Sequence, residues 1–153
     1  MSTVKNIAPD DTATVIALAE VSGLFNSDGV ELIRERLTSA ASEKLWFGAF
    51  DEGLKGVIYC VPEPMTDGTW NILMLIVSPD SHGQGYGRTL MSYVEETLAK
   101  RGGRLVIVET SSADGLERAR AFYPKCGYTE EARIRNFYTA GDDKIIFTKG
   151  LTL

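Results

Sequence analysis

Apolar side chains recur at helical spacing in the first forty residues of the chain. Two segments show this pattern, with charged residues between the apolar positions, and a short run that could form a strand, residues 3–9, precedes them. Aspartates stand near the start of the first segment, where they favour the beginning of a helix. We therefore expect two helices, in residues 10–25 (apolar face Val15, Leu18, Ala19) and in residues 27–41 (apolar face Val30, Ile33, Leu37).

The pattern changes to short aromatic and β-branched runs in the middle of the chain. Three such runs follow one another, and a turn-like Asp-Glu-Gly separates the first two. This arrangement predicts a meander of antiparallel strands in residues 44–50, 54–61 and 69–77.

Helical and strand patterns alternate in the second half. Leu90, Val94 and Leu98 line one face of a helix that Gly102 and Gly103 end, and an apolar strand covers residues 103–110. A helix in residues 114–123 is expected to open with a capping box, and strands follow in residues 131–139 and 143–151. The order predicts an α+β fold, with helices packed on the faces of a mixed sheet.

Composition narrows the possible classes. A length of 153 residues with 44% hydrophobic content suits one globular domain, residues 1–153. The start lacks a basic region followed by an apolar one, and no apolar run is long enough for a bilayer, so we expect a cytoplasmic protein without a membrane partner. The two cysteines, Cys60 and Cys126, form no CxxC motif, which indicates reduced thiols and no metal site. A formal charge of −5 argues against nucleic acid as a partner.

Three glycines, Gly83, Gly85 and Gly87, alternate with other residues between the third predicted strand of the meander and the next helix. Glycine lets main-chain amides approach a ligand, because no Cβ stands in the way and φ can be positive. The unpaired amides and the dipole at a helix start attract an anion. The segment therefore predicts a phosphate-binding loop.

Three kinds of phosphate-binding loop have glycines in this position. A P-loop would need glycine where His82 stands and lysine where Arg88 stands, so that reading fails twice. A dinucleotide fingerprint beginning at Gly83 would need glycine at Arg88, and Ser78–Ser81 separate the loop from its strand. The dinucleotide reading stays open as an alternative, because Glu109 ends the next strand where a ribose contact would lie.

The third kind fits the spacing. The segment from Val77 to Met91 resembles motif A of the GNAT superfamily of N-acetyltransferases, whose Q/R-x-x-G-x-G/A pattern falls on residues 82–87. His82 stands where the family usually has glutamine or arginine. The segment from Glu117 to Ile134 resembles the family's motif B, in which Ala119, Tyr123, Gly127 and Tyr128 match, and Pro124 is a departure that should end the helix near that residue.

The resemblance implies a fold and a cofactor site. The fold would be a mixed, mostly antiparallel sheet of about seven strands flanked by about four helices, and splayed between strands 4 and 5. The cosubstrate would be acetyl-CoA, with the loop amides on its pyrophosphate and the preceding strand on its pantetheine amides. The implied cofactor-binding residues are Leu75, Ile76, Val77, His82, Gly83, Gln84, Gly85, Tyr86, Gly87, Arg88 and Thr89.

The resemblance also implies catalytic residues for transfer of an acetyl group to a primary amine by direct attack. Glu109 would act as the general base, Tyr123 as the proton donor to the departing thiolate, and a main-chain amide near Val77 would stabilise the oxyanion. Each side chain has a structural alternative: Glu109 as a solvated strand end, Tyr123 as a helix-packing aromatic. Cys126 has no His/Asp partner pattern, so a packed thiol is the better reading than a nucleophile.

The acceptor amine is not specified by these motifs. It could be a small molecule, a peptide N-terminus or a lysine, and the segments expected to shape its pocket are residues 21–33, residues 62–70 (with Glu63, Met65, Asp67 and Trp70) and residues 137–143. A non-catalytic CoA-binding or sensing module of the same fold is the alternative function. Exposed edges in the last two strands are compatible with a monomer or a homodimer.

Overall fold

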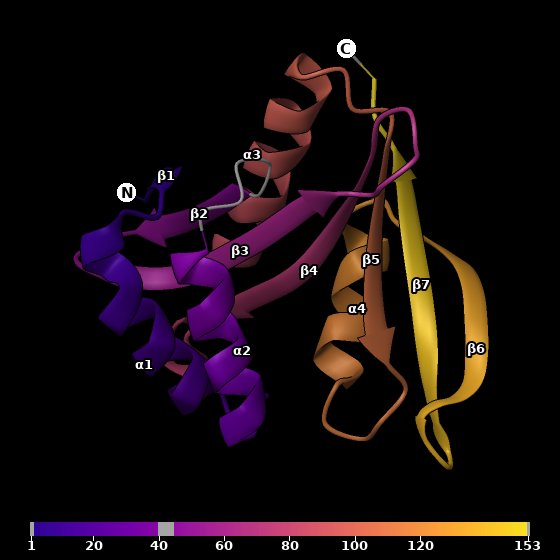
Figure 1. The fold of residues 1–153 in the computed structure, drawn as a ribbon, viewed down its shortest axis with the longest axis horizontal. Helices are drawn as coiled ribbons and strands as arrows, with labels where there is room; N and C mark the ends of the chain where they lie inside the picture. Colours follow the sequence, from indigo (N-terminus) through magenta and orange to yellow (C-terminus); the bar gives the residue numbers. More distant parts are fainter. Residues whose placement is uncertain (1, 40–44, 153) are drawn as a thin grey trace. The chain divides into compact units, whose positions relative to one another are not determined.

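A computed structural model describes residues 2–39 and 45–152 of the chain (Figure 1). The elements follow the order that the sequence pattern predicts. They are β1 (Thr3–Asn6), α1 (Thr12–Ser22), α2 (Ser27–Thr38), β2 (Leu45–Phe50), β3 (Leu54–Pro62), β4 (Thr69–Val77), α3 (Tyr86–Lys100), β5 (Leu105–Ser111), α4 (Glu117–Lys125), β6 (Thr129–Thr139) and β7 (Asp142–Gly150). Short 3₁₀ helices occupy Pro9–Asp11 and Pro79–Ser81. The predicted positions 40, 41 and 44 lie outside the described residues.

The strands form one mixed sheet in the order β1-β2-β3-β4-β5-β7-β6. β4 and β5 are parallel, whereas β1 with β2, β2 with β3, β5 with β7 and β6 with β7 are antiparallel. The β4–β5 pairing joins Thr69–Ile72 to Leu105–Val108, and it ends there although both strands continue. The predicted α+β fold, with a sheet splayed between strands 4 and 5, is confirmed.

The chain divides into two compact units. The N-terminal unit comprises Met1–Val61 and Met74–Val94, and the C-terminal unit comprises Pro62–Leu73 and Glu95–Leu153. Both β4 and α3 contribute to each unit. That the whole chain is one functional domain stays a prediction.

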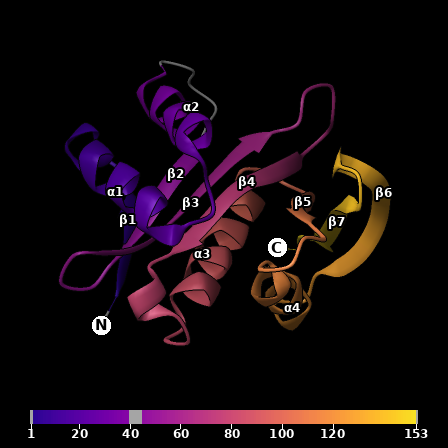
Figure 2. The same ribbon diagram turned by 90° about the horizontal axis from the view of Figure 1, so that it is seen from below.

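The N-terminal unit buries side chains on both faces of β2 and β3. Trp46 and Tyr59 stack with ring centroids 4.0 Å apart in a core with residues of α1 and α2. The neighbouring residue Phe47 points to the opposite face and meets Tyr93 of α3 edge to face. Figure 2 shows this layering, with α1 and α2 on one side of β2 and β3 and α3 on the other.

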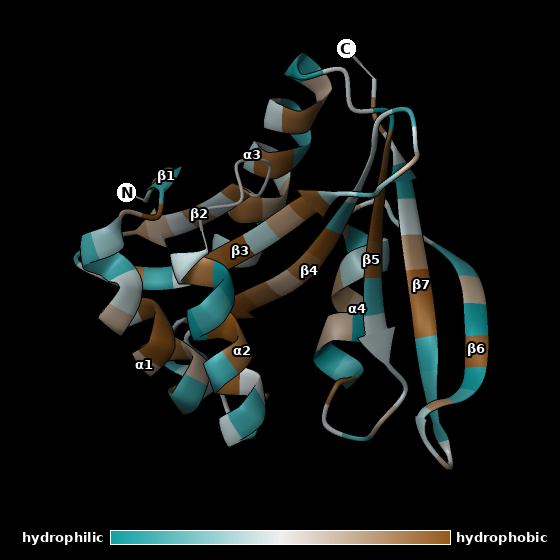
Figure 3. Ribbon diagram, viewed as in Figure 1, coloured by the Kyte–Doolittle hydropathy of each residue, from teal (hydrophilic) through white to brown (hydrophobic). Residues whose placement is uncertain are grey.

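In the C-terminal unit, α4 covers one face of β5 and β7. Tyr123 of α4 packs against Phe147 of β7 at 5.6 Å between ring centroids, beside the buried Val106 and Val108 of β5. β6 is the last strand of the sheet, and every residue of it is exposed. Figure 3 shows the difference in hydropathy: β7 carries a hydrophobic stretch in its middle, whereas β6 is largely hydrophilic.

Three predicted helix boundaries differ from the structure. α2 ends at Thr38, before the predicted end at residue 41, because Ser39 is extended. α1 ends at Ser22 instead of residue 25, because Gly23 adopts the left-handed conformation at its C-terminus. α4 begins at Glu117, with Leu116 as the N-cap, so the predicted capping box is wrong. The Glu117 carboxylate accepts from the amide of Gly115 at 2.8 Å and thereby caps the preceding turn.

Candidate active site

The glycine loop lies in the N-terminal unit between β4 and α3. Gly83 and Gly85 have φ values of +78° and +88°, and a Cβ at either position would meet no other atom within 4 Å. The first helical hydrogen bond of α3 runs from the Thr89 amide to the Gly85 carbonyl at 3.0 Å. The amides of Tyr86 and Gly87 precede that bond, and helix geometry leaves such amides without a partner inside the helix. The backbone is therefore bare where an anion would bind.

His82 is turned back onto the end of β4. Its Nε2 lies 3.0 Å from the Val77 carbonyl oxygen, and because a carbonyl only accepts, Nε2 carries the proton and donates. This hydrogen bond ties the loop to the last residue of the strand. The nearby amide of Ser78 donates to the Lys55 carbonyl at 2.8 Å. The oxyanion role of a main-chain amide near Val77 stays a prediction.

Tyr86 anchors the first turn of α3. Its side chain is buried, and its hydroxyl donates to Asp51 Oδ2 at 2.9 Å. This hydrogen bond lowers the pKa of Asp51 and raises the pKa of Tyr86. The side chain is committed to the β2–β3 turn, so the part of Tyr86 that remains for a ligand is its main-chain amide. Arg88 and Thr89 follow in the same turn, with the Thr89 hydroxyl bonded to the Gly85 carbonyl.

Leu75, Ile76 and Val77 form the last part of β4, beyond the point where pairing with β5 ends. Ile76 is 1% exposed and packs in the core with α1 and α2, whereas Leu75 and Val77 are half-buried. Their main-chain groups lie on the same strand that leads into the glycine loop.

Glu109 lies near the end of β5 in the C-terminal unit, and it is ion-paired. Lys144 Nζ of β7 lies 3.1 Å from Glu109 Oε2, and both side chains are partly buried. Glu109 is thus not a freely solvated strand end. Lys144 was not among the predicted site residues. Its contact with Glu109 depends on the pairing of β5 with β7, in which Ser111 lies opposite Lys144, and these strands are far apart in the sequence.

Tyr123 is 6% exposed at the centre of an aromatic group with Phe122, Tyr128 and Phe147. Burial raises the pKa of its hydroxyl, and the nearby Cys126 adds to the effect. The phenol is therefore protonated throughout the physiological range. α4 continues through Pro124 to Lys125, one residue beyond the proline that was expected to end it.

A partly buried polar cluster that was not predicted supports the motif B segment. The Tyr128 hydroxyl donates to Glu95 Oε2 at 2.8 Å, and Lys149 Nζ donates to Glu95 Oε1 and to the Cys126 carbonyl, each at 2.9 Å. Burial raises the pKa of Tyr128, and the Glu95 charge raises it further. Cys126 and Cys60 are both buried, and neither forms a disulfide.

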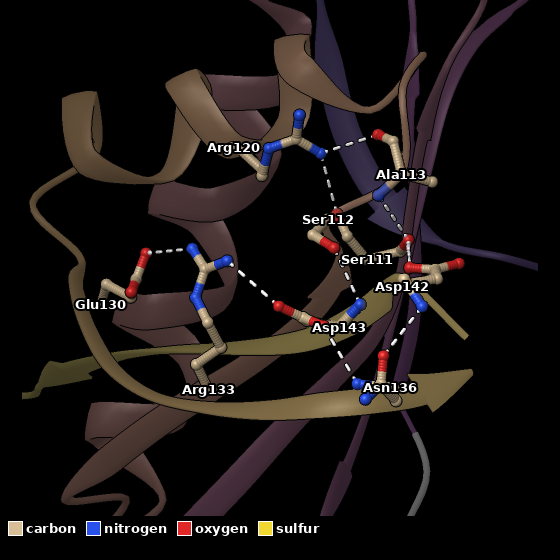
Figure 4. Close-up of polar contacts among 10 residues, drawn as sticks. Ser111, Ser112, Ala113, Arg120, Glu130, Arg133, Asn136, Asp142 and Asp143 are labelled. Atoms are coloured by element: carbon tan, nitrogen blue, oxygen red, sulfur yellow. Dashed lines mark hydrogen bonds and ion pairs between the residues drawn. The ribbon is translucent and has the colours of Figure 1, made fainter. Parts of the chain in front are cut away.

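A second polar network holds the ends of β5 and β7 (Figure 4). Arg120 of α4 donates from Nη1 to the carbonyls of Ser111 and Ala113, each at 2.9 Å. Arg133 of β6 pairs with Asp143 of β7 at 3.4 Å. The contacts fix the β5–α4 connection and the β6–β7 hairpin, which carries Lys144.

The predicted acceptor loop, residues 62–70, divides into structural and exposed positions. Trp70 is 9% exposed, and the Asp67 carbonyl accepts from Arg104 Nε at 2.6 Å. Met65 is fully exposed, and Glu63 accepts a hydrogen bond from Asn71. Asn71 is a further polar residue that sequence reasoning did not select, because it stands inside an otherwise apolar strand.

Among residues 2–39 and 45–152, no group of three or more His, Cys, Asp or Glu side chains is placed to hold a metal ion. No helix in those residues has the length and hydropathy of a membrane span.

A sequence model described as the acetyltransferase (GNAT) family matches residues 13–128, which is more than half of the chain. The protein is therefore an acyltransferase by class. Within that class, it belongs to the GNAT family of acetyltransferases. No curated protein sequence matches the chain significantly.

Solved structures share the fold over nearly the full chain. A protein from Desulfovibrio desulfuricans that is assigned to the GNAT family of acetyltransferases is 28% identical, with a TM-score of 0.92 over 99% of this chain and 100% of that one. The ribosomal-protein-S18-alanine N-acetyltransferase of Escherichia coli is 20% identical, with a TM-score of 0.82 over 100% and 96%. An aminoglycoside 6'-N-acetyltransferase complexed with coenzyme A is 19% identical, with a TM-score of 0.86 over 99% and 98%.

Proposed function

We propose that the protein is an acetyl-CoA-dependent N-acetyltransferase that acetylates a primary amine by direct attack. The observation that carries this proposal is the bare glycine backbone at the start of α3 in a chain of the GNAT family. The family uses acetyl-CoA, which supplies the activated acetyl thioester when bound. The alternative, a CoA-binding module without turnover, would keep the loop but would have no need of Glu109 and Tyr123.

The N-terminal unit supplies the groups that would hold the cosubstrate. The amides of Gly83–Gly87, together with the dipole of α3, favour the pyrophosphate, because unpaired N–H groups and a partial positive charge coincide there. Arg88 and Thr89 lie in the same first turn, and Gln84 lies between the two glycines. The main chain of Leu75–Val77 would bond the pantetheine amides in the manner of an added strand. His82 would hold the strand and the loop in register.

The C-terminal unit supplies the groups for proton transfer. An amine with the pKa of a lysine costs about 4 kcal/mol to deprotonate at pH 7. Glu109 would accept that proton, directly or through a water molecule, because its carboxylate is only partly buried and remains accessible to a donor. The ion pair with Lys144 would hold this carboxylate in position.

Tyr123 would assist the leaving group. As the amine nitrogen bonds to the acetyl carbon, the carbon–sulfur bond breaks and its electron pair leaves with sulfur. One ammonium proton passes to Glu109 before the attack and then to solvent, and the sulfur takes a proton from the Tyr123 hydroxyl. The second proton leaves the nitrogen as the amide forms and, through water, restores the Tyr123 phenol. The raised pKa of Tyr123 keeps that proton in place until the thiolate forms.

The proposal is tested by incubating the protein with acetyl-CoA and a panel of primary amines while free thiol is measured. Amine-dependent thiol release, with mass-spectrometric detection of the acetylated amine, is the expected result. Acetyl-CoA binding without thiol release for any amine would favour the non-catalytic module. If calorimetry detected no binding of acetyl-CoA or coenzyme A, both readings of the loop would be wrong.

A further inference from the structure

The C-terminal unit has a sheet face that α4 does not cover. Residues paired across neighbouring strands share a face, and side chains alternate along each strand. Val108 and Phe147 face α4, so Glu109, one residue from Val108, and Lys144, three residues from Phe147, lie on the opposite face with Ile107. Asn71 of β4 is paired with Ile107 and therefore lies on this same face.

Asn71 is an unusual residue for that position. It is 5% exposed, and its Nδ2 donates to Glu63 Oε1 at 2.9 Å. A carboxylate only accepts hydrogen bonds, so this contact fixes the orientation of the amide and directs Oδ1 away from Glu63. Within the described residues, Asn71 Oδ1 is fully buried and has no hydrogen-bond partner.

A buried acceptor without a partner destabilises the folded protein, because it has lost its hydrogen bonds to water. A ligand that brings an N–H donor to Asn71 Oδ1 would remove this cost. The adjacent Glu63 carboxylate adds a negative charge, so the donor that the pair fits best is an ammonium group. Glu63 and Asn71 thus have the properties of a binding subsite for a cationic nitrogen.

The other end of the face carries Glu109 with Lys144 and two aromatic side chains. Phe137 and Tyr138 of β6 are about half exposed, and Lys144 Nζ lies 4.2 Å from the Phe137 ring centroid. The Tyr138 ring packs edge to face against the Phe137 ring, with centroids 4.9 Å apart, and burial and the charges of Glu109 and Asp142 raise the pKa of Tyr138. Aromatic faces beside a carboxylate are suited to an alkyl ammonium.

The spacing between the two ends follows from sheet geometry. Asn71 is paired with Ile107, and Glu109 lies two residues further along β5. One strand separation and two residue rises place the Cα atoms of Asn71 and Glu109 about 8 Å apart. Two nitrogens joined by a short alkyl chain could reach both positions.

We propose that the acceptor is a linear diamine or polyamine, which binds one ammonium group at Asn71 and Glu63 while a second amine reacts beside Glu109. This inference rests on the proposed acetyl transfer and adds a specificity subsite to it. Glu63, Glu109 and Lys144 together carry one net negative charge, which a single bound ammonium group balances while the second nitrogen reacts as a neutral amine.

The test compares cadaverine with pentylamine, which has the same carbon chain and lacks the second nitrogen. With the full-length protein and saturating acetyl-CoA, we expect a KM for cadaverine at least about tenfold below that for pentylamine. Asn71→Leu and Glu63→Gln should each remove most of this difference by raising the KM for cadaverine about tenfold, while the KM for pentylamine changes less than about twofold. The control Glu96→Gln, at an exposed position of α3, should change neither.

Calorimetry with cadaverine in the absence of acetyl-CoA separates the subsite from the reaction. Asn71→Leu removes a buried acceptor without a partner, so we expect cadaverine to bind more weakly while the Tm is unchanged or higher. A purely structural role of Asn71 would not produce this combination. Glu63→Gln preserves side-chain shape and keeps the test decisive if Asn71→Leu does not fold.

Equal KM values for the two amines, or equal losses for both in the variants, would overturn the subsite while leaving acetyl transfer intact. Cadaverine binding that depends on Asn71, without acetylation of any amine, would instead support the subsite and overturn the proposed reaction.

Discussion

The Lys144 ammonium of β7 lies 3.1 Å from the Glu109 carboxylate of β5. The two strands are neighbours in the sheet, although they lie far apart in the sequence. The ion pair holds the Glu109 carboxylate in place on β5, where it would act as the general base. We expect Glu109→Gln to lower kcat about 10²- to 10⁴-fold at pH 7.

The pH dependence of that loss distinguishes a base from a structural residue. Near pH 10, a large fraction of an alkyl amine is already deprotonated, so the deficit of Glu109→Gln should shrink as the pH rises. Stopped assays between pH 7 and 10 measure this. Lys144→Met keeps the carboxylate and should lose less activity than Glu109→Gln at pH 7. A deficit that stays constant across the pH range would contradict the assignment of Glu109 as base.

Tyr123→Phe should lower kcat by about 10²-fold or more and leave the KM for acetyl-CoA within about twofold. The ring and its contacts with Phe147 and Tyr128 remain, and only the hydroxyl is removed. Steady-state kinetics of thiol release measure both constants. Tyr128→Phe is the matched control, because it deletes a neighbouring buried hydroxyl that bonds to Glu95. This variant should lower the free energy of unfolding by about 1 kcal/mol and leave kcat nearly unchanged. An unchanged kcat for Tyr123→Phe would remove the proton-donor role.

Gly83→Ala should weaken acetyl-CoA binding about tenfold, because a left-handed φ of +78° disfavours alanine by about 1 kcal/mol or more and shifts the loop amides. Gly23 provides a matched control, with a φ of +73° and open space around its Cβ position. Both variants should lose similar stability in urea unfolding. Isothermal titration with acetyl-CoA should show the loss of affinity for Gly83→Ala alone. Equal affinities in the two variants would count against the loop as the pyrophosphate site.

His82→Ala should raise the KM for acetyl-CoA several-fold to about tenfold while kcat changes little, because the hydrogen bond to the Val77 carbonyl is lost and the loop is held less firmly. His82→Gln supplies another side-chain donor and should recover part of the affinity. Glu96→Gln, at an exposed position of α3, is the control and should change neither constant. A fall in kcat at constant KM for His82→Ala would indicate a role in proton transfer instead.

The buried tyrosines predict loss of stability in alkaline solution. Burial raises the pKa of Tyr123 and of Tyr128 above the unfolded value of about 10. Above pH 10 the unfolded chain therefore releases these protons before the folded chain does. The stabilisation is complete below pH 10 and is lost as the pH rises toward the folded-state pKa values, by up to about 1.4 kcal/mol per pH unit for each tyrosine. Urea unfolding at pH 9 to 11 should show a shallower decline for a Tyr123→Phe/Tyr128→Phe variant than for the wild type.

The order of elements could be predicted from the sequence because most segments carry a clear period of apolar residues. Val15 and Ile33 mark helices, and the β-branched runs of β3 and β4 mark strands. The glycine loop could also be predicted from the sequence, because the positive φ values at Gly83 and Gly85 favour glycine. The splaying of β4 from β5 came from the family resemblance, because period alone does not specify which strands pair.

The polar partners of the site could not be predicted, because they depend on register between distant segments. Lys144 reaches Glu109 only when β7 lies antiparallel to β5, and Glu95 meets Tyr128 and Lys149 from three different elements. The local sequence at α4 gave a wrong prediction, because Asp114 and Glu117 have the spacing of a capping box. In the structure, Leu116 is the N-cap, and the Glu117 carboxylate accepts a hydrogen bond from the amide of Gly115.

The burial of both cysteines has a practical consequence for measuring the reaction. Cys60 is 0% and Cys126 is 9% exposed, and the chain has no other cysteine. A colorimetric disulfide reagent added to the native protein should therefore report liberated coenzyme A with little background from the polypeptide. A burst of colour equal to two thiols per chain would then serve as a simple indicator that a variant has lost its native packing.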